Sequence, residues 1–433
     1  MEPALLASVA AALLAFGLIS RKAEHSVVTP PMVFVALGCL LSDHGLGWIE
    51  FGIDGSVIHG LAELTLVLVL FTDASRIDLA CLRREEGLPL RLLGIGLPLT
   101  VLAGTALALL VFPGLGLWEA LLIAAILAPT DAALGQAVVS SPLVPVRIRQ
   151  SLNVESGLND GIALPVVLVA ASLAGAREEG GDLFHWLRFA GLQLVLGPAV
   201  GVAVGYLGGR LIDRATLAGW INAAFQRLSV LGLAAFAFAG AELVGGNGFI
   251  AAFVAGLTLG NATRSACESL YDFGEAEGQL LTLLVFLVFG GVMVPMALPH
   301  WDGPAVAYAV LSLTVVRMLP VALSLLGTGL QPASLAFLGW FGPRGLASIL
   351  FALLVVEEGR LESGQVLLAI ATLTVLLSTF AHGISAYPFA RLYSRRVMAE
   401  PERAGAEHRP ALELPVRLRH SAHGAAARDH VRS

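Results

Sequence analysis

The stretch VESGLNDG (residues 154–161) places Glu155, Ser156, Asn159 and Asp160 inside a run that is otherwise apolar. The segment IALPVVLVAASLAG follows it directly, and LLIAAILAPTDAALGQAVV precedes it after a short basic loop. An ionisable side chain at the centre of a membrane helix costs about 2.5–3.5 kcal/mol on insertion scales. Several polar and ionisable side chains together in such surroundings therefore predict a functional site inside a membrane.

The composition of the whole chain is that of an integral membrane protein. Of its 433 residues 57% are hydrophobic and 13% are charged, with a mean hydropathy of +0.81. Soluble globular proteins are typically about 25% charged. The apolar runs are continuous and roughly 20 residues long, as membrane-spanning helices require, whereas a β-barrel would show short alternating segments. We therefore predict an all-α polytopic membrane protein.

Thirteen apolar segments are candidate transmembrane helices. They start near residues 4, 27, 58, 88, 117, 151, 185, 225, 247, 277, 304, 332 and 364. The first lacks a preceding basic residue and is followed by Arg21 and Lys22, which is typical of a retained helix and not of a cleaved signal peptide. We predict a transmembrane domain over residues 1–396 and a disordered tail over 397–433, rich in Arg, Glu, His and Pro.

The basic residues predict the orientation of these segments. The loops after even-numbered segments carry only Arg177 and Arg360. The loops after odd-numbered segments carry Arg21, Lys22, Arg76, Arg83, Arg84, Arg91, Arg147, Arg149, Arg210, Arg214, Arg227 and Arg264. By the positive-inside rule the N-terminus lies outside the cell and the C-terminus lies in the cytoplasm.

The segment starts also indicate an internal repeat. Those near 88, 117 and 151 have counterparts 213 to 216 residues later, near 304, 332 and 364. The first three segments correspond to segments 8–10 at similar offsets, and segment 7 is a connector. An offset of seven segments reverses the membrane orientation, and inverted repeats of this kind are typical of secondary transporters. We therefore expect two inverted six-helix repeats.

Segments 5 and 12 are corresponding members of the two repeats, and each is interrupted by a proline. Segment 5 contains LAPTDAAL (127–134) and segment 12 contains WFGPRGLAS (340–348). Proline removes a backbone donor and clashes with the preceding turn. One such proline alone would be a packing kink. Two at corresponding positions, each beside a charged residue, predict a substrate site near the middle of the membrane.

Five ionisable residues lie far from the predicted membrane surfaces: Asp131, Glu155, Asp160, Arg317 and Arg344. Three carboxylates and two guanidinium groups leave one negative charge in excess. A monovalent cation or a proton would neutralise it.

Helix geometry separates these residues. Ser156 and Asp160 are four apart and share one face, whereas Glu155 and Asp160 diverge by roughly 140°. Glu155 and Asn159 share the neighbouring face. We expect Glu155 to pair with Arg317 or, failing that, with Arg344. The alternative is that Glu155 lies near the cytoplasmic end and extends its carboxylate into water.

The remaining groups predict a cation site. A hard cation prefers oxygen ligands. The Thr130 carbonyl, the Asp131 and Asp160 carboxylates and the Ser156 hydroxyl supply them, while Asn159 is expected to hold the interrupted segment 5 in place. A buried carboxylate can bind a proton near neutral pH and release it to a competing cation. Competition for one site, together with alternating access, is sufficient for cation/proton exchange.

These motifs resemble those of the NhaP-type sodium/proton antiporters of the monovalent cation:proton antiporter-1 family, which includes the animal sodium/hydrogen exchangers. The resemblance rests on APTD, ESGLNDG, GPRGLAS and the ELTLVLVLF run at 63–71, and it covers roughly residues 4–390. It implies that Thr130, Asp131, Ser156 and Asp160 form the ion site. It also implies an ion pair between Glu155 and an arginine, consistent with Arg317.

The resemblance further implies a homodimer in the cell (inner) membrane. A core part (segments 4–6 and 11–13) would move against a dimerisation part (segments 1–3 and 7–10). It implies electroneutral exchange, because electrogenic relatives carry Asp-Asp where this chain has Asn159–Asp160 and use a midplane lysine, whereas the only lysine here is Lys22 in a loop. Sodium or lithium is the expected cation, and potassium is the alternative.

Other functions receive less support. A cation channel would need a continuous hydrophilic pore, but these charges cluster at one depth. The catalytic motifs HExxH, GxSxG and Walker A are absent, so we expect no enzyme. We expect no cofactor and no nucleic-acid partner, only the exchanged ions and membrane lipid. The run GFIAAFVAGLTLG (248–260) would pack either a dimer interface or the interior of the monomer.

Overall fold

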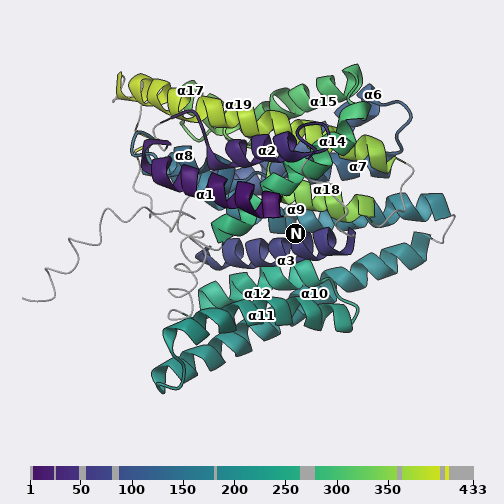
Figure 1. Cartoon of the computed structure of the whole chain (residues 1–433), viewed down its shortest axis with the longest axis vertical. Helices are drawn as coiled ribbons and strands as arrows, with labels where there is room; N and C mark the ends of the chain where they lie inside the picture. Colours follow the sequence, from purple (N-terminus) through teal and green to yellow (C-terminus); the bar gives the residue numbers. More distant parts are fainter. Residues whose placement is uncertain are drawn as a thin grey trace, which may run out of the picture.

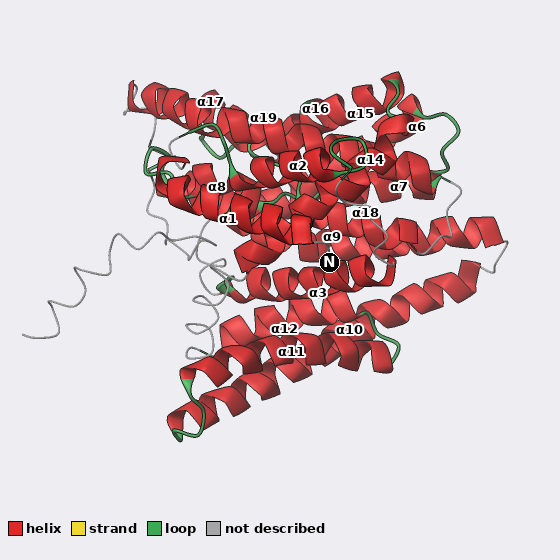
Figure 2. Cartoon of the chain, viewed as in Figure 1, coloured by secondary structure: helices red, strands yellow, loops and turns green. Residues whose placement is uncertain are grey.

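The computed structural model describes residues 3–23, 26–47, 55–79, 87–179, 183–263, 278–357, 363–399 and 405–408. Within them every regular element is a helix (Figure 2). The predicted all-α fold class is therefore confirmed. Several of the loop arginines used to predict the orientation, among them Arg83, Arg84, Arg264 and Arg360, lie outside the described residues.

The first helices are α1 (Pro3–Ala23), α2 (Pro30–Leu41), α3 (Gly55–Ser75), α5 (Leu88–Arg91), a π-helical turn η1 (Leu92–Gly96), α6 (Leu97–Val111), α7 (Leu117–Ile126), α8 (Ala132–Val139), α9 (Val146–Glu179) and α10 (Leu183–Leu217). The next are α11 (Ala223–Leu243), α12 (Gly248–Ala262), a helix over 278–288, η2 (Phe289–Met293), α14 (Val294–Ala297) and η3 (Leu298–His300). The last are α15 (Gly303–Leu313), α16 (Val315–Ser324), α17 (Pro332–Trp340), α18 (Leu346–Glu357) and α19 (Gly364–Ala399).

Each of the thirteen predicted segments coincides with one of these helices or with a consecutive group of them. By length and composition, seven helices in the described part of the chain can cross a membrane, and shorter apolar helices accompany them. The largest shift of a start is at segment 6, which was expected from residue 151 and begins at Val146. Segments 5 and 12 are each divided into two helices, α7 with α8 and α17 with α18, as their prolines predicted.

One edge of the molecule is a layer of α10, α11 and α12 that packs on α3 (Figure 1). Glycines allow this close approach. A Cβ at Gly201 would lie 2.6 Å from the carbonyl oxygen of Ala251, and one at Gly205 would lie 2.5 Å from that of Ala255. On the other face of α12, a Cβ at Gly256 would overlap the carbonyl of Phe71. The run 248–260 thus packs inside the monomer, which is one of its two predicted uses.

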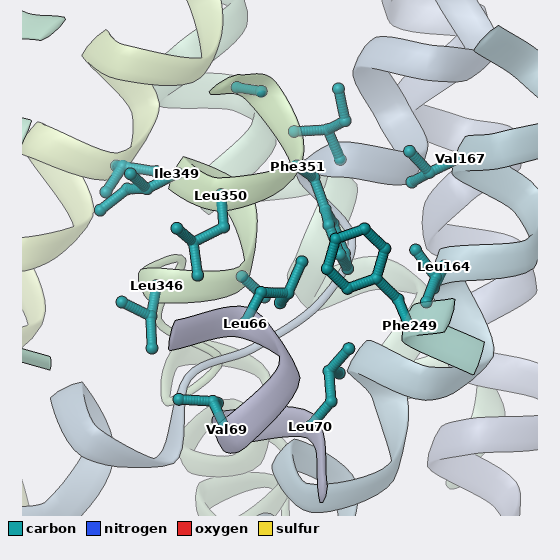
Figure 3. Close-up of a cluster of buried hydrophobic side chains, with 14 of the residues drawn as sticks. Leu66, Val69, Leu70, Leu164, Val167, Phe249, Leu346, Ile349, Leu350 and Phe351 are labelled. Carbon is teal, nitrogen blue, oxygen red and sulfur yellow. The ribbon is translucent and has the colours of Figure 1, made fainter. Parts of the chain in front are cut away.

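The opposite side of the molecule contains α17, α19, α15 and α6 (Figure 1). An apolar seam, drawn in Figure 3, joins α3 and α12 to α9 and α18. Its residues come from α3 (Leu66, Val69, Leu70), α12 (Phe249), α9 (Leu164, Val167) and α18 (Leu346, Ile349, Leu350, Phe351). The hydrophobic effect that holds such a seam has no directional requirement.

Residues 405–408, part of the predicted tail, lie folded against the helices. Glu407 is 1% exposed, and its Oε1 accepts hydrogen bonds from the backbone N–H of Gln331 (2.7 Å) and the hydroxyl of Ser334 (2.8 Å) at the start of α17. Arg147 donates to the carbonyl of Ala406. The rest of the tail beyond Ala399 lies outside the described residues, and its predicted disorder stays a prediction.

Candidate functional site: two interrupted helices that cross

The interruptions of segments 5 and 12 meet in the interior. The first runs from Leu127 to Asp131, between α7 and α8, and the second from Phe341 to Gly345, between α17 and α18. They are joined by a backbone hydrogen bond, in which Asp131 N donates to Pro343 O over 2.8 Å. A helix end leaves backbone groups without partners inside the helix. Four such ends therefore lie close together in the apolar interior.

Asp131 binds the N-terminal ends of two of these helices. Its Oδ1 accepts from the backbone N–H of Ala133 in α8, and its Oδ2 accepts from that of Leu346 in α18, both at 2.7 Å. The N-terminus of a helix carries partial positive charge, which a carboxylate stabilises. One acidic side chain from the first repeat thus closes a helix in each repeat.

Arg344 does the converse at a C-terminal end. Its Nη1 donates to the carbonyls of Ala128 and Pro129, which follow α7, with a distance of 3.1 Å to the Pro129 oxygen. A helix C-terminus carries partial negative charge, so a guanidinium there is favourable. Arg344 is completely buried. Each interruption therefore supplies a charged side chain that stabilises a helix end of the other: Asp131 contacts the start of α18, and Arg344 contacts the end of α7.

Two glycines of the GPRG motif leave the space for these contacts. A Cβ at Gly345 would overlap the carboxylate of Asp131, and a Cβ at Gly342 would overlap the guanidinium of Arg317. Any larger residue at either position would have to displace a buried charged group from its hydrogen bonds.

Helix α9 brings the VESGLNDG motif against the first interruption. The hydroxyls of Thr130 and Ser156 lie 2.9 Å apart, and Asn159 Nδ2 donates to the Thr130 hydroxyl over 2.6 Å. Asn159 thus links α9 to the interrupted segment. Asp160 lies on α9 four residues after Ser156, on the same face.

Glu155 forms an ion pair with Arg317 and not with Arg344. The pair is bidentate, with Nη1–Oε1 at 2.5 Å and Nη2–Oε2 at 2.8 Å, and both side chains are 1% exposed. Segment 11 is interrupted at Thr314, between α15 and α16, and Arg317 lies one turn further. The alternative in which Glu155 extends into water at a helix end is therefore wrong.

Solvent exposure separates the two sets of residues that the sequence predicted. Asp131 (7%), Ser156 (8%) and Asp160 (7%) retain a small exposed area, and Thr130 retains 2%. Glu155, Asn159, Arg317 and Arg344 have 1% or less. The predicted cation ligands are thus slightly more accessible than the predicted structural residues.

Two polar residues of α19 that contact the second interruption were not predicted from the sequence. Ser378 Oγ accepts from the backbone N–H of Arg344 (2.6 Å), and His382 Nε2 lies 2.9 Å from the carbonyl oxygen of Trp340. The available signal was a serine and a histidine four residues apart in an otherwise apolar segment. It was weak, because a buried hydroxyl often bonds to its own helix, as Thr379 does here to Val375.

Two interrupted helices that cross between inverted repeats, with acidic and hydroxyl side chains at the crossing, define a secondary transporter. The sequence profile of the family described as "Sodium/hydrogen exchanger, transmembrane" matches residues 8–392. The chain therefore belongs to this family of multi-pass membrane transporters.

The chain is similar to named members of the family. It is 28% identical to the K(+)/H(+) antiporter NhaP2 of Shewanella sp. (strain ANA-3), over 90% of this chain and 67% of that protein. It is 26% identical to the Na(+)/H(+) antiporter 2 of Zygosaccharomyces rouxii, over 78% of this chain and 44% of that protein. The chain thus spans about two thirds of the first relative and less than half of the second.

The same fold occurs in a solved structure. The sodium proton antiporter MjNhaP1 from Methanocaldococcus jannaschii superposes with a TM-score of 0.74 at 20% sequence identity. The match covers 90% of this chain and 98% of that one. At this identity the match shows a shared fold.

Proposed function

We propose that the protein is an electroneutral antiporter that exchanges a monovalent cation for a proton by alternating access. The observation that carries the proposal is the meeting of Thr130 with Ser156 at 2.9 Å, beside Asp131 and on the same face of α9 as Asp160. This arrangement offers a hard cation the oxygen ligands that it prefers. The ligands come from an interrupted helix and an intact one, so a movement of either changes the site.

The two aspartates take different roles in this proposal. Both oxygens of Asp131 accept backbone N–H groups that close helix ends. A proton on Asp131 would compete with these bonds. We therefore assign the exchange of cation for proton chiefly to Asp160, with Asp131 as a fixed negative ligand.

The charges around the two interruptions favour a one-for-one exchange. Arg317 balances Glu155 in the ion pair, and the opposite charges of Arg344 and Asp131 lie at the crossing. Together with Asp160, these groups carry one net negative charge. One proton or one monovalent cation neutralises it, and a site that alternates between them moves no net charge. Membrane potentials clamped at different values should therefore leave the exchange rate unchanged.

Alternating access is assigned to a shift across the apolar seam of Figure 3. The core part (segments 4–6 and 11–13) carries the crossing, and the dimerisation part (segments 1–3 and 7–10) faces a second copy in a homodimer. We place the protein in the cell (inner) membrane with its N-terminus outside and its C-terminus in the cytoplasm. The excess of basic residues after odd-numbered segments supports this orientation.

The cation is sodium or lithium in the first instance. Potassium is the second candidate, and the name K(+)/H(+) antiporter of a 28% identical relative supports it. The test is uptake of Na⁺, Li⁺ and K⁺, side by side, into proteoliposomes that carry an imposed proton gradient. Antiport predicts cation uptake coupled to proton release, with one ion preferred. Cation flux that persists without counter-transported protons would identify a channel.

A further inference from the structure

Ser378 and His382 of α19 bridge the second interruption. The hydrogen bond from Arg344 N to Ser378 Oγ (2.6 Å) lies on its α18 side, and the contact of His382 Nε2 with Trp340 O (2.9 Å) lies on its α17 side. Ser378 Oγ and His382 Nδ1 are 3.1 Å apart. Both residues have 1% exposure or less. A continuous series of hydrogen bonds thus spans the gap that Pro343 leaves in the helix.

Each ring nitrogen of His382 faces a carbonyl oxygen, which only accepts: Nε2 lies 2.9 Å from Trp340 O and Nδ1 lies 2.9 Å from Ser378 O. In the tautomer with its hydrogen on Nε2, the ring donates to Trp340 O and its Nδ1 accepts from the hydroxyl of Ser378. Ser378 Oγ accepts from the Arg344 N–H, and its own hydrogen remains available for His382 Nδ1, which also lies 2.9 Å from the Ser378 carbonyl. In that tautomer the two side chains supply a donor to the end of α17 and an acceptor to the start of α18.

The bridged segment is the one that reaches the first interruption. Arg344, held by Ser378, donates to the carbonyls of Ala128 and Pro129. Two residues on, Leu346 N binds the carboxylate of Asp131. Displacement of residues 341–345 would therefore displace the ligands of the proposed cation site.

We propose that His382 and Ser378 are positioning residues for the exchange reaction, which hold residues 341–345 where Asp131 and Thr130 are correctly placed. The inference rests on the proposed function of the Thr130–Asp160 site. It assigns no ion or proton to His382. The ring acts through the backbone of the second interruption, and its effect reaches the site through Arg344 and Leu346.

The test compares variants that keep or remove these hydrogen bonds. His382→Leu leaves the Trp340 carbonyl without a donor, His382→Gln retains an N–H that can reach it, and Ser378→Ala removes the acceptor for Arg344 N. Thr379→Val is the matched control, since it removes a buried hydroxyl of the same helix turn that bonds only within α19. An unsatisfied buried group typically shifts an equilibrium by about ten-fold or more.

We expect His382→Leu and Ser378→Ala to raise the KM for the cation by about ten-fold, while His382→Gln and Thr379→Val stay near the wild-type value. Amide hydrogen exchange across residues 340–348 should accelerate in the first two variants only. That readout does not depend on transport, so it separates a failure of the positioning role from a failure of the proposed function.

Three results would overturn the proposal. One is a folded His382→Leu protein with wild-type KM and wild-type amide exchange. Another is a His382→Gln protein as impaired as His382→Leu. The third is a His382→Gln protein with normal KM but a shifted pH profile, since that would make the ring a proton carrier. If His382→Leu does not fold, Ser378→Ala with Ser378→Thr as its conservative partner gives the same comparison.

Discussion

The two interrupted helices occupy corresponding places in the inverted repeats, yet their surroundings differ. The first interruption carries Asp131 and faces the hydroxyl of Ser156 on α9. The second carries Arg344 and is closed by Ser378 and His382 on α19. Both repeats carry an interruption at the corresponding place, but the proposed cation ligands lie at the first. The other supports it.

Helix electrostatics explain why the two copies diverged in charge. The crossing brings together two N-terminal ends, which favour an anion, and two C-terminal ends, which favour a cation or a donor. Asp131 is the anion at the N-terminal ends of α8 and α18, and Arg344 is the cation at the C-terminal end of α7. At the end of α17, His382 Nε2 lies 2.9 Å from the Trp340 carbonyl oxygen. Identical chemistry in both repeats would leave one pair of ends without the charge that it favours.

The largest expected effect concerns the two aspartates of the proposed cation site, Asp160 and Asp131. Asp160→Ala should abolish exchange, by at least about a hundred-fold, because the excess negative charge that attracts the cation is removed. Asp131→Ala should do the same and also weaken the caps of α8 and α18. Proteoliposome uptake measures the loss, and size-exclusion chromatography verifies folding. The control is Asp302→Asn at the N-cap of α15, away from the crossing. Robust exchange by Asp160→Ala would remove that residue from the site.

The sequence was sufficient to predict the interruptions and the buried charges, because both are costly in lipid and are therefore informative. Pro129, Pro343 and the polar residues of VESGLNDG stand out against apolar runs. From the sequence, Arg317 was the first candidate partner of Glu155 and Arg344 the second, and the sequence did not decide between them. The choice depends on the bend at Thr314 and on the space that Gly342 leaves for the guanidinium.

Other contacts could not be predicted, since they depend on tertiary placement. His382 and Ser378 become informative only once α19 is known to pass the second interruption. Glu407 reads as one charge among many in a polar tail, and its burial at the start of α17 has no local signal. The roles of the cation ligands stay predictions, although the structure brings Thr130 and Ser156 together.

The next effect tests whether the second repeat supports the first through the Glu155–Arg317 pair. Glu155→Ala leaves Arg317 buried without its counter-ion, which should lower the free energy of unfolding by about 3–5 kcal/mol. Thermal unfolding in detergent measures this as a lower melting temperature. The double variant Glu155→Ala with Arg317→Ala should lose less, because no unpaired charge remains. An unchanged melting temperature for Glu155→Ala would count against the pair.

A smaller effect distinguishes the two glycines of the second interruption. Ala at either position overpacks a buried contact, which costs about 1–3 kcal/mol. Gly345→Ala should displace Asp131 and reduce exchange, whereas Gly342→Ala should displace Arg317 and lower chiefly the melting temperature. Gly364→Ala is the control, since no atom lies within 4 Å of the added Cβ. Equal effects of the first two variants on cation KM would show that the interruption moves as one unit.

The smallest effect concerns the far end of α17, where Glu407 accepts the N–H of Gln331 and the hydroxyl of Ser334. Glu407→Gln keeps the shape but removes the charge that favours a helix N-terminus, at a cost of about 0.5–1 kcal/mol. We expect a slightly lower melting temperature and an unchanged cation KM, because the crossing lies at the other end of α17. The exposed neighbour His408 gives the control, His408→Gln. A change in cation KM for Glu407→Gln alone would show that α17 transmits the state of residues 405–408 to the second interruption. The second repeat would then transmit changes at residues 405–408 to the proposed cation site, in addition to holding that site in place.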